Sequence, residues 1–276
     1  MSSTYIPNPL DPSLYRITED EAKFLKECTG ITDDEELKQH ILEVQAEAYA
    51  LTGNSAYSDV LKLGKTRENA IMLDIGCGFG NDSRRVISDG FPLQNVLCTD
   101  LLEGFFNTGH KLFKTTPESS PLAFFGGDIF DTKFIYPQTT TIPNLSALEN
   151  IGQLKGQVSV IHASALFHLF VYDKQRELVG IMGQLLSPQP GSIILGYQAG
   201  APNNEKAAAL QANIRLTKIH SPETWKDLWA GEDGPFKPDE VEVHAEARAF
   251  TTDEKLGATG SAEGDYYWLM WSVLRR

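Results

Sequence analysis

Three glycines spaced two residues apart form the part of the chain best suited to binding a nucleoside. Gly76, Gly78 and Gly80 follow the mostly apolar run Ile71–Ile75, in which Asp74 stands two residues before the first glycine. Such a run predicts a buried strand that turns sharply into a helix and leaves its backbone bare for a ligand. An ordinary tight turn after a buried strand is the alternative interpretation.

Two further acids follow predicted strands. Asp100 lies 20 residues after Gly80, at the end of the predicted strand Val96–Cys98. A carboxylate there can hold both hydroxyls of a ribose. Asp128 ends a third predicted strand that begins at Leu122. One such acid could be a solvated turn residue, but acids at three successive strand ends indicate a nucleoside site.

The glycine spacing distinguishes between two kinds of nucleoside ligand. A dinucleotide-binding turn has its third glycine one position later, where this chain has Asn81. An acid followed by glycines at every second position resembles the class I S-adenosylmethionine (SAM) methyltransferases. SAM carries an ammonium and a sulfonium but no phosphate, so a carboxylate favours it and would repel a pyrophosphate. The resemblance implies SAM as cofactor and S-adenosylhomocysteine as product.

The same resemblance implies a set of cofactor contacts. Asp100 and Leu101 would hold the ribose, Asp128 would bond the adenine amino group, and Ile129 would cover the ring. Cys77 would contribute through its backbone. The full predicted cofactor set is Asp74, Gly76, Cys77, Gly78, Gly80, Asp100, Leu101, Asp128, Ile129 and Ala163.

His168 is the candidate catalytic base, because it follows the predicted fourth strand, which begins at Val158. Methyl transfer is a direct displacement, so the protein must mainly align donor and acceptor and exclude water. A base is required only if the acceptor is a phenol or an alcohol. His162 lies inside the strand and is the weaker candidate. A purely structural histidine is the alternative role for His168.

Aromatic residues are the candidates for a substrate pocket. Trp225 and Trp229 are four residues apart in a predicted helix and share one face, which predicts either a pocket wall or core packing. Tyr172 opens the helix that follows His168. The predicted substrate-binding residues are Tyr49, Phe167, Tyr172, Trp225 and Trp229.

Alternating strands and helices must position these residues. Two C-terminal strands, Val241–Phe250 and Tyr266–Leu274, should pair antiparallel at the sheet edge. We therefore expect an α/β fold, a Rossmann-like, doubly wound and mostly parallel sheet with an antiparallel C-terminal edge strand and N-terminal lid helices. Residues 1–60 should form an extended segment and the lid helices, and residues 61–276 the SAM-binding domain, as one globular unit. Packing against the edge of the sheet is the alternative role for the N-terminal helices. A helical patch is predicted near Leu145–Leu154.

The amino-acid composition limits the kinds of molecule that this protein is expected to bind. A chain of 276 residues with 41% apolar content can bury a sizeable core. Its formal charge of −13 does not supply the basic face that nucleic acid requires, so a small molecule is the expected substrate. We find no secretory signal and no membrane-spanning run, which predicts a cytoplasmic protein without membrane insertion. Three cysteines at unrelated spacings argue against a disulfide framework or a metal site.

A narrower resemblance covers nearly the whole chain. It is similar to the fungal methyltransferases of meroterpenoid and related secondary-metabolite pathways, and the Ala-Ser-x-x-Phe-His-Leu-Phe element is the more specific part. The departures are Asn81, where glutamine is commoner, and Ala56-Tyr57, where a tyrosine-proline pair is expected. The matching segments are Pro7–Pro9, Tyr15, Val44–Tyr49, Leu73–Asp82, Ala163–Phe170, Pro190–Gly196 and His220–Trp229.

The resemblance implies O-methylation of a polyketide, terpenoid or aromatic metabolite, most often as a methyl ester on a carboxyl group, and a homodimer. Methylation of a phenol or alcohol, or of nitrogen or carbon, are the alternatives within the class. A non-catalytic SAM-binding regulator is the alternative outside it. A nicotinamide oxidoreductase is disfavoured by Asn81.

Overall fold

The structure, a computed structural model, describes a defined part of the chain. The described residues are 17, 19, 22, 23, 26, 31–39, 54–113, 115–134, 144–211, 217–249 and 267–276. Residues 34–39 are helical, as expected for the start of the second N-terminal helix. The proline-rich start, Tyr49 and most of the predicted lid helices lie outside the described residues.

In the described part of the chain, seven strands form one sheet with the order β3-β2-β1-β4-β5-β7-β6. The first five strands run parallel, and β7 pairs antiparallel with both β5 and β6. The strands are β1 (Ile71–Ile75), β2 (Val96–Asp100), β3 (Ala123–Gly126), β4 (Val158–His162), β5 (Ile193–Gly200), β6 (Val241–Ala249) and β7 (Tyr267–Arg275).

Helices alternate with the parallel strands, which confirms the doubly wound, class I methyltransferase type of fold. The α-helices of the described residues are α3 (Tyr57–Thr66), α4 (Asn81–Ser88), α5 (Glu103–Leu112), α6 (Tyr172–Leu185), α7 (Asn204–Gln211) and α8 (Pro222–Ala230). The short 3-10 helices are η3 (Leu93–Asn95), η4 (Ile129–Asp131), η5 (Leu145–Ala147), η6 (Ile151–Leu154) and η7 (Phe167–Leu169).

The predicted helical patch near Leu145–Leu154 is two 3-10 turns, η5 and η6, instead of one α-helix. Asn144 begins the first turn by accepting the Ser146 N–H, and Asn150 begins the second by accepting the Gly152 N–H. Each asparagine side chain therefore caps a new turn and interrupts a continuous helix.

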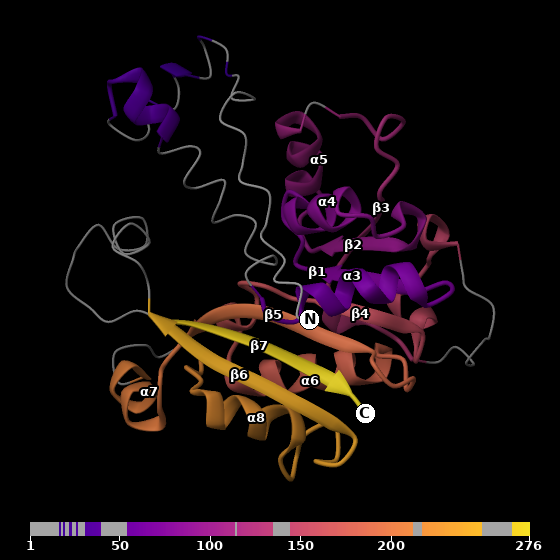
Figure 1. Ribbon diagram of the computed structural model, residues 1–276, viewed down its shortest axis with the longest axis vertical. Helices are drawn as coiled ribbons and strands as arrows, with labels where there is room; N and C mark the ends of the chain where they lie inside the picture. The colour runs from indigo at the N-terminus through magenta and orange to yellow at the C-terminus, as the bar shows by residue number, and fades with distance from the viewer. Residues whose placement is uncertain are drawn as a thin grey trace, which may run out of the picture.

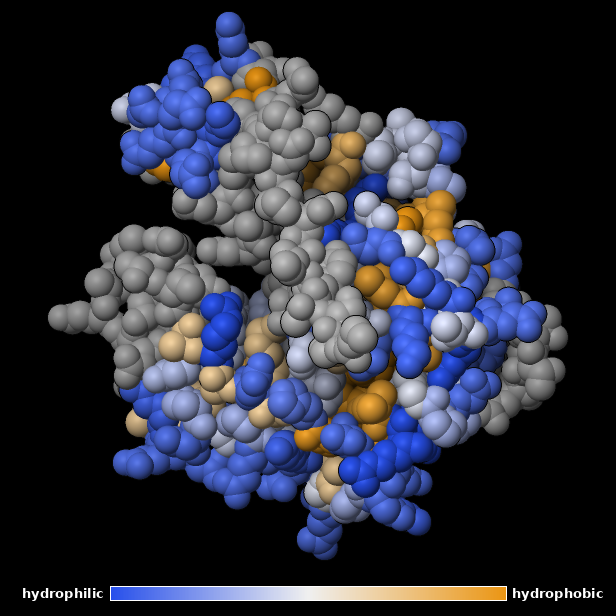
Figure 2. All heavy atoms as spheres, viewed as in Figure 1, coloured by the Kyte–Doolittle hydropathy of each residue, from blue (hydrophilic) through white to orange (hydrophobic). Residues whose placement is uncertain are grey.

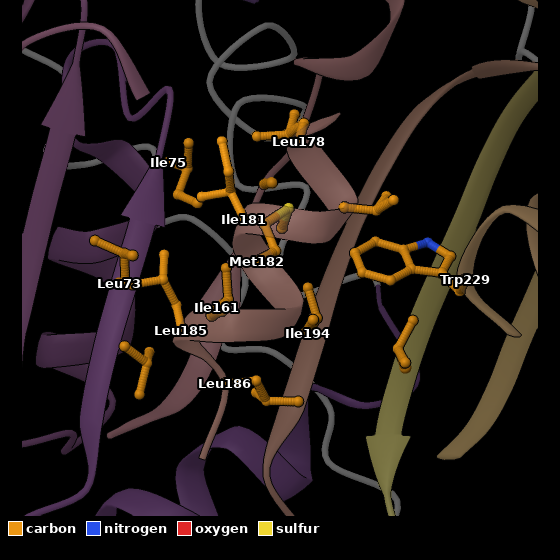
Figure 3. Packing of buried hydrophobic residues seen from close by; sticks show 14 of the residues in the cluster. Leu73, Ile75, Ile161, Leu178, Ile181, Met182, Leu185, Leu186, Ile194 and Trp229 are labelled. Atoms are coloured by element: carbon orange, nitrogen blue, oxygen red, sulfur yellow. The ribbon is translucent and has the colours of Figure 1, made fainter. Parts of the chain in front are cut away.

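Both faces of the central strands are buried, which explains their nearly continuous apolar runs. All five residues of β1 are buried, and its alternate side chains enter two different clusters. Met72 packs on the side of α3 and α4, whereas Leu73 packs on the side of α6 and α8. Figure 3 shows Leu178, Ile181, Met182 and Leu185 of α6 among side chains of β1, β4 and β5.

The antiparallel edge of the sheet is confirmed, with β7 as its inner strand and β6 as its outer strand (Figure 1). Along β6 the exposed side chains include those of Glu242, His244, Glu246 and Arg248. Charged side chains on an edge strand discourage pairing with another chain. Hydrophilic residues predominate on the face of the molecule in Figure 2, with smaller apolar areas between them.

The order of the strands places a topological switch point between β1 and β4. From β1 the sheet grows in one direction through β2 and β3, and in the other through β4 and β5. In such sheets the connections diverge at this point and leave a crevice at the carboxyl ends of the strands, where ligands bind. Among the described residues, no helix has the length and apolar character needed to cross a membrane.

Candidate functional site

The glycine-rich turn leads from the carboxyl end of β1 into α4, as predicted. Gly76, Gly78 and Gly80 all have left-handed backbone angles, with φ of 71°, 53° and 74°. The backbone N–H groups of Gly76 and Cys77 donate to the Thr99 carbonyl at 2.9 and 3.1 Å, which fixes the turn to the end of β2. A side chain at Gly78 would meet open space, so the backbone there is bare toward the crevice.

Asp100 ends β2 and is half-buried beside this turn. Its Oδ2 accepts the Gly78 N–H at 3.0 Å, and its Oδ1 accepts the Leu102 N–H at 2.9 Å. Each carboxylate oxygen can accept further bonds. The carboxylate therefore shapes the glycine turn and keeps acceptor capacity for two ribose hydroxyls. Leu101, the other predicted ribose contact, is 67% exposed.

Asp128 and Ile129 border a cavity of about 370 Å³ beyond the end of β3. Asp128 is exposed and caps η4 by accepting the Phe130 N–H at 3.0 Å, while Ile129 is half-buried. Thr99 and Ile151 also line this cavity. The volume can hold a group the size of a purine. The exposed Asp128 carboxylate can accept a hydrogen bond from an amino group on such a ring.

Asp74, Ala163 and Cys77 present little surface to a ligand. Asp74 is 2% exposed and Ala163 is fully buried. Asp74 would therefore affect a bound cofactor indirectly, through the residues that surround it. Cys77 is half-buried, and its hydrogen bond with Cys98, burial and nearby charges raise its thiol pKa. A protonated thiol fits the backbone role predicted for Cys77 better than a nucleophilic one.

His168 lies in η7, just beyond β4, as predicted. Its Nδ1 is buried and has no hydrogen-bond partner among the described residues. Burial lowers the pKa of His168, so its ring is neutral at neutral pH. A neutral imidazole with an unused nitrogen has the properties of a proton acceptor.

The predicted aromatic pocket residues are divided between core and surface. Phe167, Trp225 and Trp229 are fully buried, and their rings pack around Trp271 of β7. Their burial favours the core role over the pocket wall. Tyr172, at the start of α6, is 43% exposed and remains available to a substrate. Tyr49 lies outside the described residues.

A buried polar group that the sequence interpretation undervalued links β1 to β4. Asp74 and His162 are register partners on these adjacent strands, and Oδ1 of Asp74 lies 2.7 Å from Nδ1 of His162. A signal was present: each is an ionisable residue in a mostly apolar strand, and buried charged groups need partners. The two residues are 88 positions apart in the sequence, so the pairing can be recognised only from the order of the strands in the sheet.

Exposed apolar side chains gather at the carboxyl edge of the sheet. They stand on the connections that follow the parallel strands β1, β2 and β4 and on the helices that begin there. These side chains are Phe79, Leu101, Leu102, Phe105, Leu169, Val171 and Tyr172, each at least 37% exposed. Phe79 and Phe105 make an edge-to-face contact with ring centroids 5.9 Å apart. Apolar side chains at a crevice indicate an apolar ligand.

The described residues contain no cluster of three or more His, Cys, Asp or Glu side chains arranged to hold a metal ion. The bare glycine turn, the Asp100 carboxylate and the adjoining cavity fit the uncharged adenosine part of SAM. With the strand order, these features define the class I SAM-dependent methyltransferase type of site and fold.

Known proteins of similar sequence indicate which kind of methyltransferase this chain resembles. Residues 10–53 match the family model described as the meroterpenoid methyltransferase N-terminal domain. The O-methyltransferase phiE of a fungal species is 32% identical over 181 residues, which are 65% of this chain and 54% of phiE. The chain thus aligns with about half the length of phiE.

Two further similarities cover more of the chain. The asnovolin E/chermesin D methyltransferase nvfJ of Aspergillus novofumigatus is 28% identical over 236 residues, 79% of this chain and 78% of that protein. The structure of geranyl diphosphate methyltransferase in complex with SAM shares the fold, with a TM-score of 0.50 and 13% identity over 87% of this chain and 88% of its own. Together these findings support a SAM-dependent methyltransferase of the kind found in fungal secondary metabolism.

Proposed function

We propose that this protein transfers the methyl group of SAM to a carboxyl group of a small, largely apolar metabolite and so forms a methyl ester. The observation that carries the proposal is the gathering of exposed apolar side chains around the carboxyl edge of the sheet, beside the glycine turn. An apolar molecule placed there meets the cofactor crevice at the switch point. The name of phiE, an O-methyltransferase, supports oxygen as the acceptor atom.

The chemistry requires positioning more than proton transfer. Bound SAM supplies a methyl group on a positively charged sulfur. An ionised carboxylate oxygen forms a bond to that methyl carbon while the carbon–sulfur bond breaks and its electron pair stays on sulfur. No proton has to be removed from a carboxylate at neutral pH. The tasks of the protein are therefore to hold the ribose through Asp100, to align the acceptor and to exclude water.

The function is tested by the stability of the labelled product to alkali. Purified protein is incubated with methyl-labelled SAM and an organic extract of the source organism, and the product is treated with mild alkali. We expect the label to be released as volatile methanol, as a methyl ester requires. The Asp100→Ala variant is the matched control and should incorporate much less label. Label that survives alkali would contradict the ester and indicate an ether, amine or carbon acceptor.

His168 favours one second candidate, methylation of a phenol or an alcohol. Its neutral, half-buried ring just beyond β4 suits a base that accepts the hydroxyl proton as the oxygen attacks. In that case the label survives alkali, and His168→Ala lowers kcat by about 100-fold or more. If the product is an ester, the same variant should keep most of its kcat, because a carboxylate has no proton to lose.

Other expectations remain predictions. The formal charge of −13 argues against a nucleic-acid substrate. A homodimer and a cytoplasmic location follow from the family resemblance and the sequence alone. The family-model match to residues 10–53, described as an N-terminal domain, supports our proposal that an N-terminal part of the chain ends near residue 60.

A further inference from the structure

A chain of buried polar side chains runs beneath the glycine turn and ends at the crevice. Oδ1 of Asp74 lies 2.7 Å from Nδ1 of His162, and Oδ2 of Asp74 accepts the Ser83 hydroxyl at 2.7 Å. The side chains of Asp74 and His162 are each 2% exposed. Both carboxylate oxygens are thus engaged, and the His162 ring is held on one side by a fixed partner.

The other end of this chain is Ser164. Its Oγ lies 2.6 Å from Nε2 of His162, and it stands two residues past the carboxyl end of β4. Ala165, which follows, has a left-handed φ of 49°, and its N–H donates to the Tyr197 carbonyl at 2.7 Å. This conformation costs a non-glycine residue energy, so the surrounding structure must impose it. Ser164 is therefore held in place at the half-buried edge of the crevice.

Ser164 also lies close to the cofactor side of the crevice. Leu166, two residues further on, packs against the glycine turn, with its Cδ1 2.9 Å from where a side chain at Gly76 would begin. The loop after β4 and the turn after β1 therefore meet at the switch point. A hydroxyl on this loop can reach a molecule that lies against the turn.

The charges around His162 decide which way the Ser164 hydroxyl points. Within the described residues the charged groups that face the ring are Asp74 of β1 and Asp82 of α4, whose Oδ2 lies 3.8 Å from Nε2. The register partner of His162 on β5 is the apolar Leu195. Burial alone would lower the pKa of His162, but the charges of Asp74 and Asp82 and the hydrogen bond to Asp74 raise it above its ordinary value.

A charged imidazole donates from both ring nitrogens. Nδ1–H then donates to Asp74 and Nε2–H donates to Ser164, so the serine oxygen acts as an acceptor toward the ring. Its own proton is left to point away from His162. With a neutral ring and Nδ1–H bound to Asp74, Ser164 would instead donate to Nε2 and offer only lone pairs to a ligand.

We propose that Ser164 donates a hydrogen bond to the acceptor carboxylate, and that the buried His162–Asp74 pair orients the serine hydroxyl for this donation. The inference rests on the proposed function, because a hydroxyl donor suits the anionic acceptor that an ester requires. SAM also carries a carboxylate on its methionine part, so the affinity for S-adenosylhomocysteine distinguishes the two ligands in the test below. Ser164 would be the group that touches the substrate, and His162 a positioning residue. The negative charge of Asp82 is offset when SAM brings its sulfonium and ammonium into the same crevice.

The test begins with the labelled ester described above. Alkaline hydrolysis of that product returns the free acid, which then serves as the defined acceptor. For Ser164→Ala we expect the KM for this acid to rise about tenfold or more, because a hydrogen bond to a charged group is lost. The dissociation constant of S-adenosylhomocysteine should stay within about twofold. Ser164→Thr keeps the hydroxyl and should restore much of the affinity for the acid.

Ser187→Ala is the matched control. Ser187 is also buried, but it follows α6 at the opposite end of β4, where its N–H donates to the Val158 carbonyl. Its substitution should change neither KM nor cofactor affinity.

His162→Gln tests the positioning role through the pH profile. In the wild type, kcat/KM for the acid should fall as pH rises through the pKa of His162, since the serine then turns toward the ring. In the variant, kcat/KM should be low and should lose this fall. If the variant does not fold, the comparison of Ser164→Ala with Ser164→Thr still tests whether the Ser164 hydroxyl binds the acceptor carboxylate.

The outcomes separate the two proposals. A methyl ester together with an unchanged KM in Ser164→Ala overturns the inference and leaves the function intact. Loss of S-adenosylhomocysteine affinity without a change in the KM for the acid also overturns it, because Ser164 would then be a cofactor contact. An alkali-stable product of the wild-type protein overturns the ester function and the inference with it.

Discussion

At the scale of single residues, the carboxylates of this site hold the local backbone in place through their own hydrogen bonds. Asp100 accepts backbone N–H groups from Gly78 and Leu102, and Asp128 accepts one from Phe130. The acids at the strand ends thus combine two roles, fixing the local backbone and offering further acceptor capacity to a nucleoside.

Asp100→Ala should weaken binding of S-adenosylhomocysteine by about tenfold or more, because two ribose hydroxyls lose a charged acceptor. Isothermal titration calorimetry measures this directly. The exposed Asp59 on α3 provides the control, since Asp59→Ala removes a carboxylate without touching the site. Unchanged affinity in Asp100→Ala would show that the ribose contact has been assigned to the wrong residue.

The sequence predicted the positions of the glycine turn and of the acids at the strand ends because these signals are local. Glycine spacing and an acid after each strand can be read within a few residues. The Asp74–His162 pair could not be predicted in the same way, because only the order of the sheet makes β1 and β4 neighbours. The roles of Trp225 and Trp229 were also open, since Trp271, which completes their packing, arrives from the last strand.

At the scale of elements, the glycine turn depends on how closely α5 approaches it. A Cβ added at Gly109 of α5 would lie 2.1 Å from the Phe79 carbonyl oxygen, far inside contact distance. The helix therefore packs backbone to backbone against the turn. Gly104, in the first turn of the same helix, faces open space.

Gly109→Ala should push α5 away from the turn, which lowers the free energy of unfolding and weakens S-adenosylhomocysteine binding together. Overpacking of this kind costs about 1–3 kcal/mol. Gly104→Ala should be neutral or stabilising by up to about 1 kcal/mol, because alanine favours a helix more than glycine does. Urea unfolding and calorimetry on both variants measure the two effects. Equal behaviour of the pair would contradict the close packing.

At the scale of the whole molecule, the stability of the fold should depend on pH through a buried histidine. His220 packs between Tyr172 and Trp225, and its Nε2 lies 2.8 Å from Oε1 of Gln175. Burial and the nearby Lys218 lower the pKa of His220 from 6.5 to about 4. Between these two values His220 therefore binds fewer protons in the folded state than in the unfolded state.

The stability contributed by this group is fully present above pH 6.5 and is lost as pH falls toward about 4. From the two pKa values the loss is about 3 kcal/mol. Urea unfolding at several pH values should show it in the wild type and in His244→Gln, which alters an exposed histidine. His220→Gln should lose most of this slope. A wild-type free energy that stays constant from pH 7 to pH 4 would contradict the assignment.

The doubly wound architecture was predictable at this scale because alternating strands and helices admit few arrangements. The position of β7 inside β6 was not part of that prediction. Its physical reason lies in composition, since β7 carries the buried Leu269, Trp271 and Val273 while β6 alternates with charged residues. The more apolar strand takes the inner position, where both its edges are paired.

The switch point between β1 and β4 also marks where parts of two related proteins could be joined into a hybrid. Most of the residues assigned to the cofactor, from the glycine turn to Ile129, precede residue 144, whereas Ala163 and the loop assigned to the acceptor follow β4. A hybrid protein joined between β3 and β4 would therefore combine the cofactor half of one relative with the acceptor half of another. The two halves meet at Asp74 and His162, so hybrids should tolerate exchange best when both parents carry this pair.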